Sequence, residues 1–214
     1  MATKKTIAFD LETIADSTVI PFLPEVEPDT RLKDPEKIKA SIAEKTVKRD
    51  AELGLNPATS LICCFGYATA EGTGHIMLKD EQSEKALLVE AWDLLAKFDH
   101  FVTFNGISFD VPTLMFHSLK NRIRPAVKIS IKKYVIENHT DVRAVLGNWD
   151  GFAKGKLDFF AKMLLGGSGK DGMTGDQVQG YWDMDLKDDI AAYCESDCRL
   201  TRDIFELMQK YYLL

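Results

Sequence analysis

Apolar stretches broken by turn residues predict a chain that begins with strands and then alternates strands with helices. Residues 5–10 have the pattern of a short buried strand that ends in acidic side chains. The segments 60–70 and 73–79 are strand-like and are separated by Glu71-Gly72, which predicts a β-hairpin. We expect two further strands, at 100–104 and 140–142.

Helical spacing of apolar residues marks several other segments. Asp34 followed by Pro35 is a good helix start and Gly54 a good stop, which predicts an amphipathic, strongly charged helix between them. Its charge run favours a solvated helix face, and an arm that grips nucleic acid is the alternative. Further helices are expected at 84–98, 110–119, 157–164 and 186–212, and a glycine-rich loop at 166–175.

This order of elements predicts an α/β fold. A hairpin followed by alternating strands and helices implies a mixed β-sheet with helices packed on its faces. In such sheets, ligands collect beyond the ends of the central strands. The strand predicted at 5–10 and the one predicted at 100–104 are both followed by acidic residues, so we expect the chemistry at this edge of the sheet.

Composition is that of a soluble globular protein. The 214 residues suit one domain, and the hydrophobic fraction of 45% and charged fraction of 28% are close to the averages for such proteins. No apolar run approaches the roughly 18 residues of a membrane helix, and the apolar stretch near the N-terminus is too short for a signal peptide. We therefore expect a cytoplasmic protein without membrane association.

Charge and cysteine content narrow the functional classes. The formal charge of −6 argues against a protein that coats nucleic acid through a basic surface, but allows an enzyme that gathers carboxylates around cations. Cys63 and Cys64 lie in an apolar run, and Cys194 and Cys198 are four apart on a predicted helix. A zinc site would need a second closely spaced pair and usually a histidine nearby, so free buried thiols are favoured.

Acidic residues follow the first predicted strand in the pattern Asp-x-Glu. Side chains alternate across a strand, so Asp10 and Glu12 point to the same face. Two carboxylates on one face repel each other unless a cation lies between them. The alternative is a strand end whose acids are simply solvated.

Two more patterns place carboxylates at helix positions. Asp110 follows the turn-forming pair Asn105-Gly106 and falls at a predicted helix N-terminus, where an ordinary N-cap is the alternative. Tyr193 and Asp197 are four apart on the last predicted helix, so their side chains share one face. A buried tyrosine beside a surface aspartate is the alternative for this pair.

Taken in order, the three patterns resemble the exonuclease motifs of the DEDD superfamily. Asp-x-Glu, Asn-Gly-x-x-Phe-Asp and Tyr-x-x-x-Asp occur in that order between Asp10 and Asp197. The tyrosine in the third motif makes the chain similar to the branch that includes the proofreading domains of family B DNA polymerases, and residues 104–112 look especially like that branch. The resemblance implies a ribonuclease-H-like mixed β-sheet with helices on both faces.

The resemblance also implies a domain organisation and an activity. It spans nearly the whole chain, so we expect residues 1–214 to form a single, free-standing 3′→5′ exonuclease domain. An insertion at about 15–58 has no counterpart in the motif pattern, and the region 121–156 matches poorly. The implied substrate is nucleic acid, with single-stranded DNA favoured over RNA, and no protein partner is indicated.

Two divalent cations, Mg²⁺ or Mn²⁺, are the cofactors that such an enzyme implies. By resemblance, Asp10 would bridge both ions, Glu12 and Asp197 would complete the site on the nucleophile side, and Asp110 would hold the second ion. Tyr193 would orient the attacking water, because a phenol with an ordinary pKa of about 10 is a poor general base at neutral pH.

Residues beside the acids are candidates for substrate contact. We expect Leu11, Thr13, Asn105 and Phe109 to lie against the terminal nucleotides. Leu11 and Phe109 could stack on bases without regard to sequence, although core packing is the alternative for Phe109. A basic cluster would either follow the phosphate backbone or solvate a loop. The cluster comprises Arg122, Arg124, Lys128, Lys132 and Lys133.

Two other functions compete with the exonuclease. A phosphatase of the haloacid dehalogenase type also begins with a strand that ends in Phe-Asp-x-Asp, and Asp188-Asp189 could imitate its late acidic pair. Here, however, the second acid is Glu12, and no lysine motif stands at the expected place. A non-catalytic nucleic-acid-binding protein on the same fold is the other alternative, although a pure binder gains nothing from clustered carboxylates where phosphate must lie.

Overall fold

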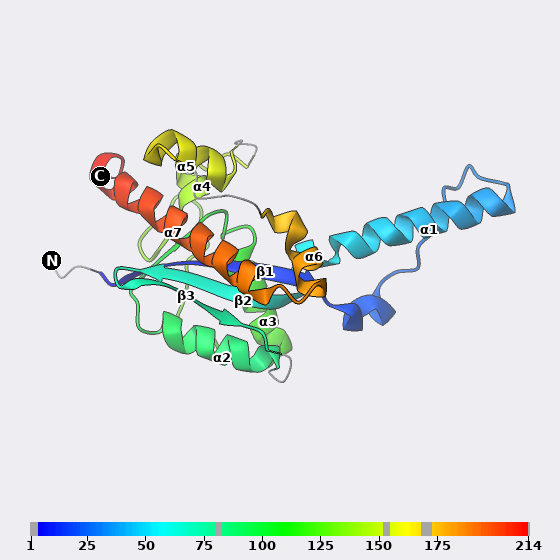
Figure 1. The fold of residues 1–214 in the computed structure, drawn as a ribbon, viewed down its shortest axis with the longest axis horizontal. Helices are drawn as coiled ribbons and strands as arrows, with labels where there is room; N and C mark the ends of the chain where they lie inside the picture. Colours follow the sequence, from blue (N-terminus) through cyan, green and yellow to red (C-terminus); the bar gives the residue numbers. More distant parts are fainter. Residues whose placement is uncertain (1–3, 80–82, 152–154, 168–172, 214) are drawn as a thin grey trace.

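A five-stranded mixed β-sheet forms the centre of the molecule, as the order of elements predicted (Figure 1). The computed structural model describes residues 4–79, 83–151, 155–167 and 173–213. The strands are β1 (Thr6–Ala15), β2 (Ser60–Thr69), β3 (Gly72–Met77), β4 (His100–Thr103) and β5 (His139–Asp141). Their spatial order is β3-β2-β1-β4-β5. Strand β1 pairs antiparallel with β2 and parallel with β4, and β2 and β3 form the predicted hairpin.

Helices cover both faces of this sheet, which confirms the ribonuclease-H-like arrangement (Figure 1). The α-helices of the described residues are α1 (Pro35–Glu52), α2 (Glu84–Leu95), α3 (Asp110–Lys120), α4 (Val142–Leu146), α5 (Leu157–Leu165), α6 (Val178–Asp183) and α7 (Lys187–Tyr211). The same part of the chain also contains the 3₁₀ helices η1 (Ser17–Phe22), η2 (Leu53–Leu55) and η3 (Gly175–Gln177). Helices α2 and α3 lie on one side of the sheet, and α4, α5 and α7 on the other (Figure 1). Among the described residues, no helix is both long enough and apolar enough to cross a membrane.

Alternation along β1 directs its side chains to opposite faces of the sheet. Ile7, Phe9 and Leu11 pack into one core cluster with buried residues of α2 and α3. Ala8 belongs to the cluster on the opposite face, which includes buried residues of α5 and α7. Because Asp10 and Glu12 share the phase of Ala8, their side chains face α7. The strand thus carries its acids toward the long C-terminal helix.

The first strand is longer than predicted, and its acids lie within it instead of after its end. Strand β1 continues through Ala15 because its antiparallel pairing with β2 extends that far, with a register shift between Glu12 and Thr13. The parallel pairing with β4, in contrast, ends at Ala8. Beyond Ala8, the backbone N–H groups on this edge of β1 no longer pair with β4. They can therefore donate hydrogen bonds to other partners.

Most other elements agree with the sequence pattern to within a few residues. Helix α2 ends at Leu95, three residues before the predicted end, and α3, α5 and α7 agree within one residue at each end. Helix α6 and the 3₁₀ helices η1, η2 and η3 were not predicted. The region 121–156 holds β5, close to the strand expected at 140–142, followed by the short α4. Residues 168–172 of the predicted glycine-rich loop lie outside the described residues, and Gly175 begins η3.

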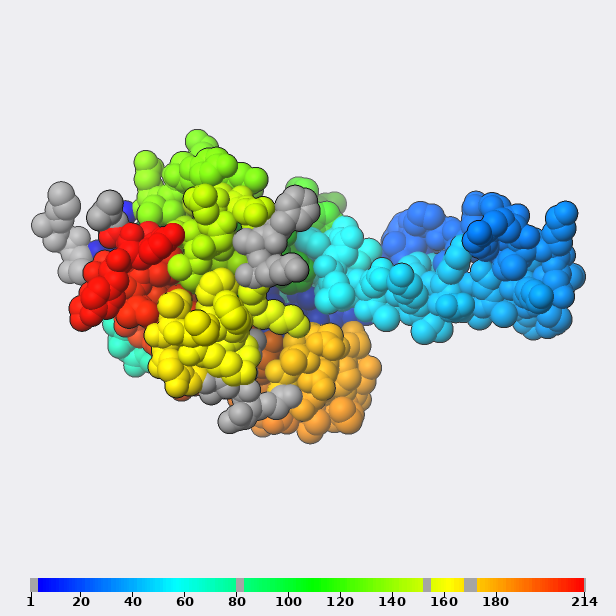
Figure 2. All heavy atoms as spheres, turned by 90° about the horizontal axis from the view of Figure 1, so that it is seen from above, coloured from blue at the N-terminus to red at the C-terminus, as the bar shows by residue number. Residues whose placement is uncertain are grey.

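Helix α1 projects away from the sheet (Figures 1 and 2). Its predicted start is confirmed, because the Asp34 carboxylate caps the helix by accepting a hydrogen bond from the Glu36 N–H at 2.9 Å, and Pro35 occupies the first turn. No residue of α1 is buried, so its charged side chains are solvated, as the charge run favoured. At its base, η2 packs Leu53 against the body of the protein.

Candidate active site

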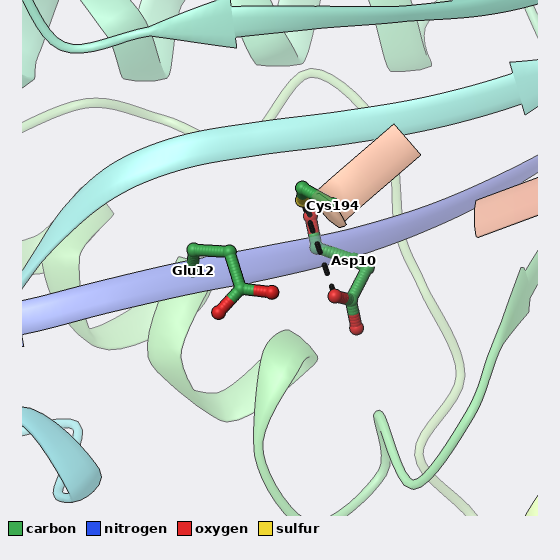
Figure 3. A group of neighbouring side chains, drawn as sticks. All are labelled: Asp10, Glu12 and Cys194. Carbon is green, nitrogen blue, oxygen red and sulfur yellow. Dashed lines mark hydrogen bonds between the residues drawn. The ribbon is translucent and has the colours of Figure 1, made fainter. Parts of the chain in front are cut away.

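Strand β1 and helix α7 bring the first and third motifs together. Figure 3 shows Asp10 and Glu12 on the strand, with Cys194 of α7 beside them. The Cys194 thiol lies 3.6 Å from the Asp10 carbonyl oxygen and 3.9 Å from Asp10 Oδ2. One ligand atom from each of these three residues lies within 4.8 Å of the other two. Residues that are 184 positions apart in the sequence therefore share one small volume.

A glycine in β2 allows α7 to approach the sheet this closely. Gly66 is paired with Asp10 across β1 and β2. A Cβ atom at Gly66 would lie 2.5 Å from Cys194 Sγ and 3.1 Å from the Cys194 carbonyl carbon and oxygen. Such contacts are shorter than van der Waals packing allows, so a side chain at this position would push α7 and its catalytic candidates away from β1.

The cysteines behave as the sequence favoured. All four are buried free thiols: Cys63, Cys64, Cys194 and Cys198. Burial raises the pKa of Cys63 well above its ordinary value. These thiols fill the space between β2 and α7 and act as small apolar side chains there.

The second motif reaches the first through a backbone contact. Asp110 is 3% exposed, and its Oδ1 atom accepts a hydrogen bond from the Leu11 N–H at 3.0 Å. Phe109 is the residue at the N-cap position of α3, and Asp110 is the first residue inside the helix. The Asp110 carboxylate thus binds a backbone N–H of β1 beyond the segment that pairs with β4. This contact favours the interpretation of Asp110 as a site residue over that of an ordinary N-cap.

Burial and like charges shift the protonation of the acids. Burial, together with the nearby Asp141 carboxylate, raises the pKa of Asp110 to about 7 against two opposing backbone hydrogen bonds. Burial also raises the pKa of Asp10, and its acidic neighbours add to the shift. These neighbours are Asp110, Glu12 and Asp197, so the other three predicted acids all lie close enough to act on Asp10.

Tyr193 stands beside this acidic cluster. Its phenol hydrogen-bonds to Asp197, and burial together with the nearby carboxylates raises the pKa of the phenol above its ordinary value. The phenol is therefore protonated at any physiological pH and can donate a hydrogen bond. Its hydroxyl also points toward Gly175, whose Cβ position would lie 3.9 Å from the phenol oxygen.

A cavity of about 680 Å³ opens over the acids. Three of the four expected substrate contacts, Leu11, Asn105 and Phe109, line it. Leu11 is also part of the core, whereas Phe109 is half-buried and lies outside the core clusters of the described residues. Thr13 is not among the described lining residues; its hydroxyl donates to the Gly54 carbonyl at 2.6 Å and ties β1 to η2.

Several lining and supporting residues were missed in the sequence. The Asp141 carboxylate accepts hydrogen bonds from the N–H groups of Asn105 and Ile107, at 3.0 and 2.9 Å, and so fixes the turn of the second motif. Arg143 and Lys156 line the cavity. The basic cluster at 122–133 contributes none of the described lining residues. The sequence signal for Asp141 and Arg143 is limited to their short spacing. That spacing predicts a role in the site only once β5 is known to pair with β4.

Comparisons with known proteins identify a family for this chain and a solved structure with a similar fold. Residues 59–211 match the model of the family described as "Predicted 3'-5' exonuclease related to the exonuclease domain of PolB". This range includes Asp110, Tyr193 and Asp197, whereas Asp10 and Glu12 precede it. A search of curated proteins found no match.

A solved family B DNA polymerase, from the hyperthermophilic archaeon Pyrobaculum calidifontis, has a similar fold. The superposition has a TM-score of 0.65 at 14% sequence identity. It covers 97% of this chain and 25% of the polymerase, so the chain spans about a quarter of that protein's length. At this identity the likeness shows the fold alone. The family match, which covers most of the chain, shows that this protein belongs to the family of predicted 3′-5′ exonucleases related to the exonuclease domain of PolB.

Proposed function

We propose that this chain removes nucleotides from the 3′ end of single-stranded DNA by metal-dependent hydrolysis of the terminal phosphodiester bond. The observation that carries the proposal is the convergence of Asp10, Glu12, Asp110 and Asp197, from three separate elements, at the floor of one cavity. Folding against this much like-charge repulsion is expected where cations compensate the charge.

The donor set fits two divalent cations. All four acids offer carboxylate oxygens, which Mg²⁺ and Mn²⁺ prefer, and the cavity leaves room for phosphate and water. Asp10 would contribute to holding both ions, Glu12 and Asp197 would hold the ion on the nucleophile side, and Asp110 would hold the other. When bound, such a pair of cations would lower the pKa of a water molecule and neutralise charge on the leaving oxygen.

The role of Tyr193 follows from its protonation. Because the pKa of its phenol is raised, Tyr193 cannot accept a proton from water, and it acts by donating a hydrogen bond. Its contact with Asp197 places the hydroxyl beside the nucleophile-side carboxylates. We propose that Tyr193 orients the attacking water and the scissile phosphate.

The cavity favours a short, unpaired 3′ end. Its volume of about 680 Å³ falls in the range of small-ligand pockets and admits only a few nucleotides. Phe109 and Leu11 offer apolar surface on which a base can stack without sequence preference. DNA is preferred to RNA in this proposal because the family is related to a DNA polymerase's exonuclease domain. We further propose that residues 1–214 form one domain in which 15–58 is an insertion.

Metal dependence and substrate form test this function together. Purified protein is incubated with single- and double-stranded DNA and RNA, with chelator, Mg²⁺ or Mn²⁺. We expect hydrolysis of single-stranded DNA that is lost with chelator, returns with either ion, and is absent in Asp10→Asn at each ion concentration. Binding without hydrolysis under all conditions would favour the non-catalytic alternative, and activity that survives exhaustive chelation would exclude the two-cation mechanism.

A further inference from the structure

Arg143 occupies a fixed position on the cavity wall that the catalytic assignment leaves unused. It is half-buried, belongs to α4, and lines the cavity together with the acids. Its Nη1 atom donates a hydrogen bond to Asn105 Oδ1 at 2.6 Å. Asn105 is itself in a left-handed conformation, with φ of 69°, at the end of β4.

Asp141 holds both partners of this contact in place. Its carboxylate accepts hydrogen bonds from the Asn105 N–H and from the Ala144 N–H in the first turn of α4, both at 3.0 Å. One buried side chain therefore fixes the turn that carries Asn105 and the helix that carries Arg143. A guanidinium held this way loses less conformational freedom on binding a ligand than an exposed, unrestrained lysine.

The described lining of the cavity is mostly acidic, so a positively charged side chain is needed there to bind phosphate. Six of the described lining residues are acidic: Asp10, Glu12, Asp110, Asp158, Asp176 and Asp197. Only Arg143 and Lys156 are basic among the described lining residues. Two divalent cations would balance the negative charges of the four acids at the floor. Each additional nucleotide of the bound strand, however, places another negatively charged phosphate against a wall that is otherwise acidic. Lys156 is exposed, whereas Arg143 is half-buried and clamped.

Arg143 acts outside the acidic cluster itself. Its guanidinium is held by Asn105, just after β4, on the wall of the cavity. The four acids that would hold the cations come instead from β1, α3 and α7. Arg143 is therefore positioned for a phosphate next to the scissile one.

We propose that Arg143 binds the second phosphodiester linkage from the 3′ end, the one immediately 5′ of the bond that is cut, and thereby sets how far the strand enters the site. This assignment rests on the proposed exonuclease function. Arginine matches phosphate because its planar guanidinium can donate two parallel hydrogen bonds to two phosphate oxygens. Arg143 is a positioning residue, and its effect should appear in binding of the strand.

A double-mutant cycle between protein and DNA tests this assignment. We would measure binding of short 5′-fluorescent single strands to the wild type and Arg143→Gln, with Ca²⁺ in place of Mg²⁺ to slow hydrolysis. One methylphosphonate, which has no charge, replaces the phosphate at the first, second, third or fourth linkage from the 3′ end. Arg202→Gln is the matched control, because Arg202 is also half-buried but lines a separate cavity at the opposite end of the sheet.

We expect Arg143→Gln to weaken binding of the native strand roughly 10- to 100-fold, the range for a hydrogen bond to a charged group. A methylphosphonate at the second linkage should weaken wild-type binding similarly and add little to the loss in Arg143→Gln. At the third and fourth linkages the two losses should multiply, and Arg202→Gln should show no coupling at any position.

Two results would overturn the assignment. Losses that multiply at the second linkage would mean that Arg143 only supports Asn105 structurally, and coupling at the first linkage would place Arg143 on the scissile phosphate. If wild-type protein binds circular and linear strands equally, the proposed exonuclease function fails together with this inference. Specific binding of a free 3′ end without coupling refutes the role of Arg143 alone.

Discussion

The Asp110 carboxylate accepts a hydrogen bond from the Leu11 N–H at 3.0 Å, although 99 positions separate the two residues. This contact places an acid of α3 against the strand that carries Asp10 and Glu12. Asp110 therefore has two roles that can be separated: it accepts a hydrogen bond and it carries a negative charge. An asparagine could accept the same hydrogen bond through its amide oxygen but would carry no charge.

Asp110→Asn should therefore uncouple stability from activity. We expect the metal-free variant to unfold at a higher temperature than the wild type near pH 8, because a buried charge is removed and the contact with Leu11 is kept. Hydrolysis should fall by roughly 10³-fold or more, since a cation ligand is lost. Thermal unfolding and single-turnover rates measure the two effects. A variant that is both less stable and fully active would refute the assignment of Asp110 as a ligand.

Tyr193→Phe should be milder than loss of a carboxylate. The change removes one hydrogen bond and leaves the acids in place, so we expect kcat to fall by roughly 10- to 100-fold with little change in KM. Steady-state kinetics at saturating Mg²⁺ test this, with Tyr181→Phe as the control, because Tyr181 is not among the described lining residues. Loss as complete as that in Asp10→Asn would show that the phenol has a larger role in the chemical step.

The acidic cluster should make stability depend on pH. The pKa of Asp110 is raised to about 7 in the folded protein, from an ordinary value of 3.8, so folding favours its protonated form. Its contribution to stability is thus fully present below the ordinary value and is lost as pH rises through about 7. Asp10, whose pKa is also raised, contributes in the same direction.

Metal-free protein should consequently show a lower unfolding temperature near pH 8 than near pH 5. Mg²⁺ or Mn²⁺ should reverse this difference, because cations bind the deprotonated carboxylates and compete with protons. Apparent metal affinity, measured by calorimetry, should rise as pH increases through about 7. Metal affinity that is constant across this window would contradict the proposed ligand set.

Gly66→Ala tests the close approach of α7 to the sheet. The added methyl group would lie 2.5 Å from Cys194 Sγ, so we expect a loss of about 1–3 kcal/mol in the free energy of unfolding and a large loss of activity. Gly180→Ala in α6 is the control, because its Cβ would meet no atom within 4 Å. The control should leave activity unchanged. Full activity in Gly66→Ala would mean that the spacing between β1 and α7 is not critical.

Local chemistry explains which elements could be predicted from the sequence. The start of α1 was predictable because Asp34 and Pro35 act within the first turn of their own helix. The placement of Asp10 and Glu12 on the same face of β1 followed from the alternation of side chains along a strand. The end of β1 was not predictable, because Leu11 to Ala15 are held by pairing with β2, a partner about fifty residues away in sequence.

The residues of the candidate site likewise differ in whether local sequence or distant contacts determine their place. Asp10, Asp110 and Asp197 could be named because each lies in a short pattern, and the fold brings them together as those patterns required. Arg143 could not, because its place in the cavity depends on Asp141 joining β5 to the turn at Asn105. Thr13 lies next to the acids in sequence, but the register shift after Glu12 and its bond to Gly54 direct it elsewhere.

The polarity of degradation distinguishes a 3′→5′ exonuclease from other nucleases. A single-stranded DNA labelled at its 5′ end and the same strand labelled at its 3′ end are digested in parallel with Mg²⁺, beside a circular single strand. We expect a descending ladder from the 5′-labelled strand, immediate release of labelled mononucleotide from the 3′-labelled strand, and an intact circle. The reverse label pattern, or cleavage of the circle, would contradict 3′→5′ exonuclease action by this site.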